Sequence, residues 1–333
     1  MPSCRFDVLG LGNAIVDVIS TADDDFILAQ GLLKGAMTLI GEARADALYA
    51  AMGPATLVSG GSAANTIIGV ASFGCTAAFI GKLRSDEAGA AFVHDIHAAK
   101  VSFSTALAKD GPATARCLVL VTPDAQRTMS TFLGASQSLT EADVDEDMVR
   151  QSAIIYLEGY LWDPPAAKAA FVKAAKIARE AGRQVALTLS DSFCVDRYRD
   201  EFLGLMRSGA VHIVFSNEDE LHSLYQTADF ETAVAQFRAE NVLGIVTRSE
   251  KGSLVVTQGE VFTVPAFAVD QIVDTTGAGD LFAAGFLAGL TRQKSLETCA
   301  KLGALAAAEI IQHIGARPLA ELRQLAAQSG IAI

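Results

Sequence analysis

The sequence contains few cysteines and no apolar run long enough to cross a bilayer. Its 5 cysteines are scattered, odd in number and without a Cys-x-x-Cys pair, which argues against a disulfide framework and favours reduced core residues. The most apolar runs, Leu281–Leu290 and Leu302–Ile311, are about half the length of a membrane span. The segment Met1–Asp7 contains no apolar targeting stretch. We therefore expect a soluble, cytoplasmic protein.

Charged residues are also few, at 19% of the chain, and acidic ones predominate. The formal net charge of −12 repels phosphate backbones and anionic lipid, so neither nucleic acid nor a membrane surface is an expected partner. A small anion such as ATP remains compatible with this charge if helix dipoles and a metal ion offset it locally. Hydrophobic residues make up 51% of the chain, which argues against disorder and for a sizeable core.

Short runs of Val, Ile and Leu alternate along the chain with longer segments of helical spacing. The segments expected as strands are Phe6–Leu11, Thr114–Val121, Ile154–Leu157, Val185–Leu189, Val211–Phe215 and Gly244–Thr247. The segments expected as helices are Ala166–Glu180, Asp200–Met206 and Glu231–Glu240. This alternation predicts an α/β fold, with a mainly parallel sheet covered by helices on both faces.

No linker, repeat or low-complexity tract interrupts the chain, so residues 1–333 are expected to form a single domain. The segment Gly252–Phe267 alternates in polarity around a turn and predicts an antiparallel hairpin. Residues 14–40 and 102–135 read as strands and turns within the N-terminal part of the chain. We expect these two segments to form a small β-sheet beside the main sheet, as a lid.

The strongest chemical signal is Asp274-Thr275-Thr276-Gly277-Ala278-Gly279-Asp280, which precedes an apolar helical run. Three small residues at a helix start allow a ligand to approach the backbone, and their N–H groups together with the helix dipole form an anion site. A carboxylate beside an anion site repels phosphate, but it is suited to accept a hydroxyl proton during phosphoryl transfer. The alternative is that Asp280 caps the helix, although it follows the glycines rather than preceding them.

A second signal is Gly60-Gly61-Ser62-Ala63-Ala64-Asn65, which leads from a short strand into an apolar helix. The glycines expose the backbone, and the Asn65 amide, about one turn into the helix, can bind a hydroxyl group. The alternative is a plain strand-to-helix turn in which Ser62 is the N-cap.

A third segment, Gly10–Asp17, begins like a dinucleotide-binding fingerprint. Ile15 replaces its third glycine, however, and Asp17 follows too early to bind a ribose, so this interpretation is weak. A Walker-type phosphate loop is also absent from the sequence. Asn13 and Asp17 fit better as polar groups at a strand end that face a polyhydroxy ligand.

Two further polar segments follow predicted strands. Asn217 and Glu220 come after one strand, where their oxygens suit a Mg²⁺ ion held through water. An acidic first helical turn is the alternative explanation for the neighbouring Glu218 and Asp219. The segment Thr247–Gly252 follows the next strand and could border a nucleotide pocket with its small residues.

The order of these motifs resembles the ribokinase-like (PfkB) carbohydrate and nucleoside kinases over essentially the whole chain. Gly60-Gly61 with Asn65 is similar to the N-terminal signature of that family, and Asp274-Thr275-x-Gly277-Ala278-Gly279-Asp280 to its C-terminal one. Asn217-x-x-Glu220 resembles its metal-and-phosphate motif, and Thr247-x-Ser249-x-x-Gly252 its nucleotide loop, with Ser249 in place of a usual glycine. The resemblance implies a three-layer α/β/α sandwich with a β-sheet lid.

The resemblance also implies roles for these residues, with ATP and Mg²⁺ as cofactors. Asp280 would be the catalytic base, and the amides of Gly277, Ala278 and Gly279 would form the anion hole. Asn217 and Glu220 would organise Mg²⁺ and the phosphates, and Thr247, Ser249 and Gly252 would contact the nucleotide. Asn13, Asp17, Gly60, Gly61 and Asn65 would bind the substrate. Asp274, Thr276 and the Ile311–Gly315 segment would be candidates for a monovalent cation such as K⁺.

Several stretches resemble adenosine kinases within this family, among them Gly12–Asp17, Thr131–Ala135 and Leu189–Phe193. We therefore expect ATP-dependent phosphorylation of a primary hydroxyl, that of adenosine, by a monomer or homodimer. Thr276, common in sugar kinases, keeps a sugar or sugar-acid kinase open as the alternative. Two lesser alternatives are a non-catalytic nucleoside- or sugar-sensing module and a nicotinamide-dependent oxidoreductase.

Overall fold

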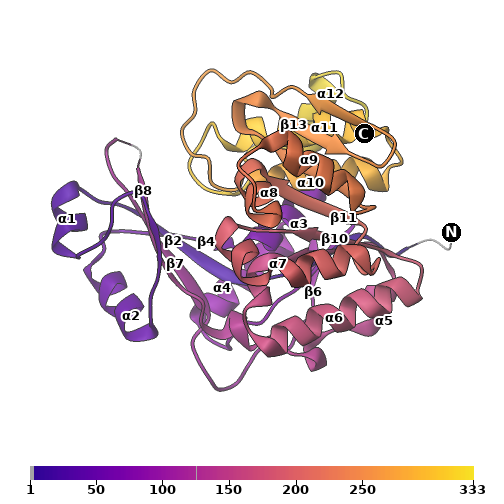
Figure 1. The fold of residues 1–333 in the computed structure, drawn as a ribbon. Coiled ribbons are helices and arrows are strands. Elements are labelled where there is room, and N and C mark those ends of the chain that lie inside the picture. The colour runs from indigo at the N-terminus through magenta and orange to yellow at the C-terminus, as the bar shows by residue number, and fades with distance from the viewer. Residues whose placement is uncertain (1–3, 125) are drawn as a thin grey trace.

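The computed structural model describes residues 4–124 and 126–333, which form two β-sheets and their covering helices (Figure 1). The larger sheet has nine strands in the order β14-β13-β12-β11-β10-β9-β1-β5-β6. These strands are β1 (Phe6–Leu11), β5 (Ala77–Ile80), β6 (Val101–Phe103), β9 (Ser152–Glu158), β10 (Gln184–Thr188), β11 (Ile213–Asn217), β12 (Leu243–Thr247), β13 (Ser253–Val256) and β14 (Val261–Val264). All neighbours from β12 to β6 pair in parallel, whereas β13 and β14 form the antiparallel hairpin predicted from the sequence.

The main sheet is buried on both faces, which explains its continuously apolar strands. In β9, Ile154 and Tyr156 contribute to one hydrophobic core, and Ile155 and Leu157 to the other. The first core is covered by α3 (Ser62–Ser72), α4 (Glu87–Ala98), α10 (Ala278–Thr291), α11 (Leu296–Ile310) and α12 (Leu322–Gln328). The second is covered by α5 (Glu146–Arg150), α6 (Pro165–Glu180), α7 (Ser192–Arg207), α8 (Glu218–Tyr225) and α9 (Phe230–Ala239). The predicted α/β/α sandwich is confirmed.

The small sheet has five strands in the order β3-β8-β7-β2-β4 and projects from the main sheet (Figure 1). Its strands are β2 (Ile15–Thr21), β3 (Met37–Leu39), β4 (Thr56–Gly60), β7 (Ala115–Val121) and β8 (Arg127–Phe132). It carries the helices α1 (Asp24–Ala29) and α2 (Glu42–Ala51), and α2 packs on it through Leu48. Its role as a lid remains a prediction.

Three details of this region differ from what the sequence predicts for the small sheet. The helix α1 lies inside the stretch read as strands and turns, and the Asp23 carboxylate caps it by accepting a hydrogen bond from the Phe26 N–H at 2.7 Å. The strand β4 joins the small sheet although it lies outside both predicted segments. Residues 102 and 103 belong to β6, and therefore to the main sheet.

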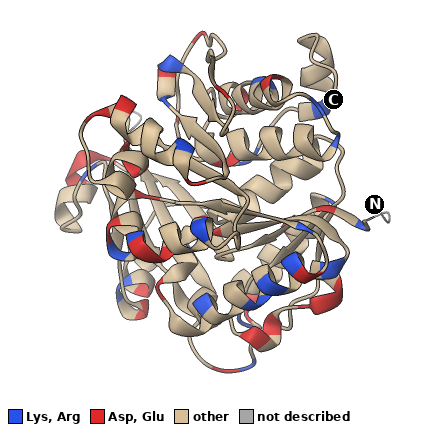
Figure 2. Ribbon diagram, turned by 45° about the vertical axis from the view of Figure 1, so that its right-hand side comes forward, with Lys and Arg blue, Asp and Glu red and all other residues tan. Residues whose placement is uncertain are grey.

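The parallel strands bring several loop ends to one edge of the main sheet. β1, β9, β10, β11 and β12 all end there, and parallel α/β sheets bind ligands at this edge. In the view of Figure 2, basic and acidic residues are interspersed over the helices that face the reader. Among the described residues, no helix combines the length and apolarity that a membrane span requires.

Candidate functional site

A cavity of about 650 Å³ lies between the carboxyl edge of the main sheet and the inner face of the small sheet. The predicted site residues that line it are Asn13, Asp17, Gly61, Asn65, Asn217, Glu220, Thr247, Thr276, Gly277, Ala278, Gly279 and Asp280. The predicted residues outside its lining are Gly60, Ser249, Gly252 and Asp274. The fold therefore gathers motifs from both ends of the chain into one site.

Asp280 lies in the first turn of α10, and its carboxylate is held by side chains of α3. The Ser62 hydroxyl donates to Asp280 Oδ1 at 2.6 Å, and the Asn65 amide Nδ2 donates to Oδ2 at 2.9 Å. Burial raises the pKa of Asp280, and these two hydrogen bonds and the Arg317 charge partly oppose that shift. A carboxylate that is held in place with a raised pKa is suited to accept a proton.

The capping alternatives for both motifs are wrong. The N-cap of α10 is Gly277, with φ of 78°, and the N-cap of α3 is Gly61, with φ of 99°. Both positions need glycine because a side chain is strained at such φ values. Ser62 is already inside α3, and its hydroxyl is directed to Asp280 and does not cap the helix.

Backbone N–H groups at the start of α10 are available to an anion. Among the described residues, no acceptor bonds the N–H of Gly277 or of Gly279, whereas the Ala278 N–H donates to the Thr275 carbonyl at 3.2 Å. Gly279 is also exposed. The N-terminus of this 14-residue helix therefore offers free donors and a positive dipole end beside Asp280.

Asp17 faces the same cavity from the small sheet. Its carboxylate packs against Gly60, where an added Cβ would lie 2.5 Å from Asp17 Oδ2. Burial raises the pKa of Asp17 to about 6, against the lowering effect of the positive charges of Arg317 and Arg127. The buried Asn65 Oδ1 also has no hydrogen-bond partner in the described structure. Asp17 and Asn65 thus present unsatisfied acceptors, which suit the hydroxyl groups of a ligand.

The side chain of Asn13 forms hydrogen bonds within the protein, although it also lines the cavity. Its amide Nδ2 donates to Glu158 Oε1 at 2.6 Å, and its Oδ1 accepts from the Ser136 hydroxyl at 2.8 Å. The Glu158 carboxylate also accepts from the Ala63 N–H at 2.8 Å. Glu158 is 1% exposed, and burial raises its pKa to about 7. Glu158 is not among the site residues predicted from the sequence.

Two arginines of the site were also missed. Arg127, the first residue of β8, donates to the Thr276 hydroxyl at 2.7 Å and pairs with Asp274 at 2.5 Å. Arg317 donates to the Ser59 carbonyl at 2.8 Å, and burial lowers its pKa to about 10. Both stand alone in the sequence, far from their partners, so no spacing could have indicated them.

Asn217 and Glu220 form a capping box at the start of α8. The Asn217 Oδ1 accepts from the Glu220 N–H at 2.8 Å, and Glu220 Oε1 accepts from Asn217 Nδ2 at 2.7 Å. Burial raises the pKa of Glu220 to about 7. Glu218 instead pairs with Arg248 at 3.1 Å, which leaves it no role at the cavity. Each Glu220 oxygen retains a lone pair, so a hydrated Mg²⁺ fits this donor set, whereas the described residues contain no cluster for direct ligation.

The nucleotide-loop residues lie in different environments. Thr247 ends β12 at the cavity, and its hydroxyl donates to the Ser216 carbonyl at 3.4 Å. Ser249 is exposed, with φ of 51°, a left-handed conformation that explains why glycine is usual there. Gly252 is buried, with φ of 86°, and an added Cβ would lie 2.2 Å from the Val264 carbonyl oxygen. The nucleotide contacts of Ser249 and Gly252 stay a prediction.

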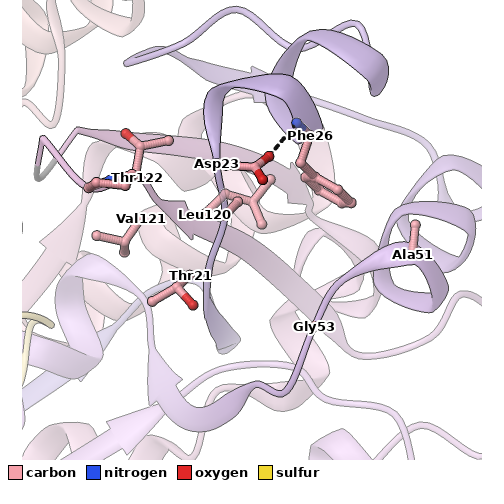
Figure 3. A pocket seen from close by; sticks show the side chains of 10 residues that line it. Thr21, Asp23, Phe26, Ala51, Gly53, Leu120, Val121 and Thr122 are labelled. Atoms are coloured by element: carbon pink, nitrogen blue, oxygen red, sulfur yellow. Dashed lines mark hydrogen bonds between the residues drawn. The ribbon is translucent and has the colours of Figure 1, made fainter.

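A separate cavity of about 520 Å³ opens at the outer end of the small sheet (Figure 3). Ten residues line it, and Asp23 is the only ionisable one among them. Its carboxylate is already used to cap α1 at the Phe26 N–H (Figure 3). This second cavity therefore lacks the paired polar groups that make the first one a candidate active site.

Comparison with known proteins identifies relatives of this chain. Residues 37–322 match the family described as pfkB family carbohydrate kinase. The crystal structure of adenosine kinase from Sinorhizobium meliloti is 53% identical, with a TM-score of 0.91 over 98% of this chain and 99% of that chain. The crystal structure of a probable sugar kinase from Rhizobium etli CFN 42 is 50% identical, with a TM-score of 0.93 over 99% of this chain and 100% of that chain. Adenosine kinase of Saccharomyces cerevisiae is 26% identical over 92% of this chain and 94% of its own length.

Proposed function

The chain belongs to the pfkB family of carbohydrate kinases, and we propose that it transfers the γ-phosphoryl group of ATP to the 5′-hydroxyl of adenosine, giving AMP. Membership makes it an ATP-dependent phosphotransferase with an alcohol acceptor. The proposal concerns the identity of that acceptor. The similarity to adenosine kinases supports it.

One structural observation carries the choice of a nucleoside, namely that the lining of the cavity combines hydrogen-bonding groups with aromatic and apolar side chains. Asp280, Asp17 and the unpaired Asn65 Oδ1 are among its polar groups. Tyr160 and Phe193, which are 38% and 73% exposed, also line the cavity. The small sheet adds the side chains of Ile15, Val119, Met129, Met37 and Leu39. A flat purine ring stacks favourably on aromatic and apolar side chains, whereas a free sugar would leave them uncovered.

The proposed reaction uses Asp280 as the general base. Asp280 takes the proton of the 5′-hydroxyl. At the same time the hydroxyl oxygen forms a bond to the γ-phosphorus, and the bond between that phosphorus and the leaving ADP breaks. The free N–H groups of Gly277 and Gly279 stabilise the negative charge that develops on the transferring group. Asp17 and Asn65 accept hydrogen bonds from the ribose hydroxyls and thereby orient the attacking oxygen.

Mg²⁺ is part of this proposal, and Asn217 and Glu220 would hold it through its water molecules. When bound, the ion neutralises phosphate charge. The predicted monovalent-cation site fits less well, because both Asp274 oxygens are engaged. Oδ1 accepts from the Thr276 N–H at 3.0 Å, and Oδ2 accepts from the Gly315 N–H at 2.9 Å and pairs with Arg127. We therefore derive no step through a monovalent cation.

A substrate comparison tests the acceptor. Adenosine, inosine, ribose, fructose and 2-keto-3-deoxygluconate would be assayed with ATP and Mg²⁺ under identical conditions. We expect the highest kcat/KM with adenosine. A preference for ribose or another free sugar would overturn the proposal in favour of a sugar kinase, a reading that Thr276 and the similarity to a probable sugar kinase favour. Binding without product would indicate a sensing module.

The Asp280→Asn variant tests the mechanism independently of the acceptor. General-base catalysis typically contributes about 10²–10⁴-fold, so we expect kcat to fall by about that factor with the best acceptor. The Asn65 amide can turn its unpaired Oδ1 towards the introduced amide, and the melting temperature should therefore change little. Near-normal turnover of this variant would exclude Asp280 as the base.

A further inference from the structure

We infer that Glu158 is a positioning residue that fixes the small sheet relative to the main sheet, and so places Asp17 opposite Asp280. Glu158 also lines the cavity, but neither of these aspartates contacts it by a hydrogen bond, and its effect on them is transmitted through the chain segments that it binds. The inference depends on phosphoryl transfer at Asp280, as proposed above, but not on adenosine being the acceptor.

The chain passes between the two sheets four times. We call the linking segments the crossing segments. They are residues 12–14 between β1 and β2, residue 61 between β4 and α3, residues 104–114 between β6 and β7, and residue 133 between β8 and the 3₁₀ helix Gly134–Ser138. Any change in the angle between the sheets has to be absorbed at these segments.

Glu158 is the last residue of β9 in the main sheet. It binds directly to the first crossing segment and to a residue just after the second one. Its carboxylate accepts from the Asn13 amide at 2.6 Å and from the Asn13 N–H at 3.3 Å, inside the first crossing segment. It also accepts from the Ala63 N–H at 2.8 Å, two residues after the second crossing segment. That N–H belongs to the first turn of α3, which carries Ser62 and Asn65 to Asp280.

The network extends to the other two crossing segments. The Ser136 hydroxyl, just after the fourth one, lies within hydrogen-bond distance of Asn13 Oδ1, at 2.8 Å, and of the Leu133 carbonyl, at 2.5 Å. In the same 3₁₀ helix, the Ala135 N–H donates to the carbonyl of Ala113, in the third crossing segment, at 2.8 Å. All four passages between the sheets are thus connected to the Glu158 carboxylate, the third and the fourth through Asn13 and the 3₁₀ helix.

The chain packs closely around Glu158 and Asn13 at two glycines. A Cβ on Gly12 would lie 2.3 Å from Glu158 Oε2, and a Cβ on Gly61 would lie 2.1 Å from the Asn13 carbonyl oxygen. Glu158 is 1% exposed, and the free-energy cost of burying a carboxylate this completely is offset by its hydrogen bonds to Asn13 and Ala63. Every group bonded to it is an N–H donor, so a neutral carboxyl or an amide at this position must lose at least one of these bonds.

The charged surroundings make the network sensitive to protonation. Burial raises the Glu158 pKa to about 7, and the Asp280 carboxylate adds to that shift, whereas the bonds from Asn13 and Ala63 oppose it. The other titratable groups coupled to it are Tyr156 of β9 and Tyr160, whose pKa values are raised by burial and by acidic neighbours that include Glu158. Loss of the Glu158 proton near neutral pH therefore strengthens these hydrogen bonds, because an ionised carboxylate is a stronger acceptor than a neutral carboxyl group.

The test compares Glu158→Gln with Glu240→Gln as the matched control. Glu240 is also buried, at 8% exposed, but it pairs with Arg207 at 2.6 Å and contacts no crossing segment. We expect Glu158→Gln to lower kcat/KM for the acceptor at least tenfold. The inflection near pH 7 in the pH profile should become smaller, with Glu220, whose pKa is also raised to about 7, responsible for what remains. Hydrogen exchange should accelerate at residues 12–14, 61–64 and 133–136, whereas Glu240→Gln should change none of these.

A second variant keeps the inference testable if Glu158→Gln folds poorly. Ser136→Ala removes the hydroxyl that lies 2.8 Å from Asn13 Oδ1 and 2.5 Å from the Leu133 carbonyl, and it should cause a smaller loss of kcat/KM with faster exchange at residues 12–14 and 133–136. The inference is overturned if both variants keep wild-type exchange at the crossing segments and a wild-type pH profile. Hydrogen exchange needs no substrate, so a wrong acceptor and a wrong role for Glu158 give different results.

Discussion

At the scale of single residues, the protonation state of Asp17 should affect how tightly the acceptor binds. Its pKa is raised to about 6, so the folded protein carries a proton there below that pH and a negative charge above it. An ionised carboxylate accepts stronger hydrogen bonds than a neutral one. We expect KM for the acceptor to rise as the pH falls below about 6. By pH 5 it should be up to about tenfold higher than at neutral pH.

The Asp17→Asn variant separates this effect from titration of the base. It should have a raised KM that no longer varies between pH 5 and 7, while kcat keeps the acid-side decline that protonation of Asp280 causes. Steady-state kinetics at fixed ionic strength, with kcat and KM fitted separately, provide the measurement. A KM that still rises in acid in Asp17→Asn would remove Asp17 from the binding site.

Residues that belong to a local pattern could be selected from the sequence, although their roles stay predictions. Asp280, Gly277 and Asn65 belong to short motifs in which glycines or a helix start determine the chemistry, and the structure brings all three together. Arg127 and Arg317 could not be found this way. Their hydrogen-bond partners lie 149 and 258 residues away in the chain, and only the complete fold makes them neighbours.

At the scale of elements, boundaries were predictable where the apolar pattern is unambiguous. The strand Phe6–Leu11 has the predicted limits, because buried parallel strands read as continuous apolar runs. The helix α7, by contrast, extends over Ser192–Arg207, well beyond the predicted Asp200–Met206. Its first turns begin at the capping Asp191, and a kink at Tyr198, with φ of −123°, separates them from the regular part.

The close packing of α10 on α11 gives an element-scale prediction. Gly285 is buried in α10, and a Cβ there would lie 2.3 Å from the Leu302 carbonyl oxygen of α11. Gly285→Ala would force the helices apart, and overpacking of this kind costs about 1–3 kcal/mol. Gly204→Ala in α7 is the control, because no atom lies within 4 Å of its added Cβ.

Because Gly204 is an exposed helical glycine, its replacement by alanine should stabilise the protein by about 0.5–1 kcal/mol. Urea denaturation of both variants provides the comparison, and the two shifts should have opposite signs. Equal shifts in the same direction would mean that helix propensity, and not the contact between α10 and α11, governs position 285.

At the scale of the whole molecule, the relative placement of the two sheets could not be predicted from the sequence. Alternating apolar residues predict that a sheet forms, but they carry no information about the angle at which it meets another. In this protein that placement depends on contacts between distant segments. One set surrounds Glu158, and another joins Arg127 of β8 to Asp274 of the loop before α10.

The ion pair of Arg127 and Asp274 is therefore a connection between the sheets that can be measured. Both side chains are buried, at 10% and 3% exposed, and Arg127 also bonds Thr276 beside the free N–H groups of the α10 N-terminus. Removing one partner of such a pair leaves a buried charge uncompensated, at a cost of about 3–5 kcal/mol. We expect Arg127→Met and Asp274→Asn each to lower stability by about that amount.

The double variant distinguishes stability from function. Removing both charges together should restore much of the lost stability, since replacement of a buried pair by neutral groups is often nearly neutral. Phosphoryl transfer should not recover, because the small sheet is then no longer held against the anion site. Urea denaturation and kcat of the four proteins in this double-mutant cycle provide the data. Strictly additive stability losses would show that the pair does not connect the sheets, and full recovery of kcat would show that the connection is not needed for catalysis.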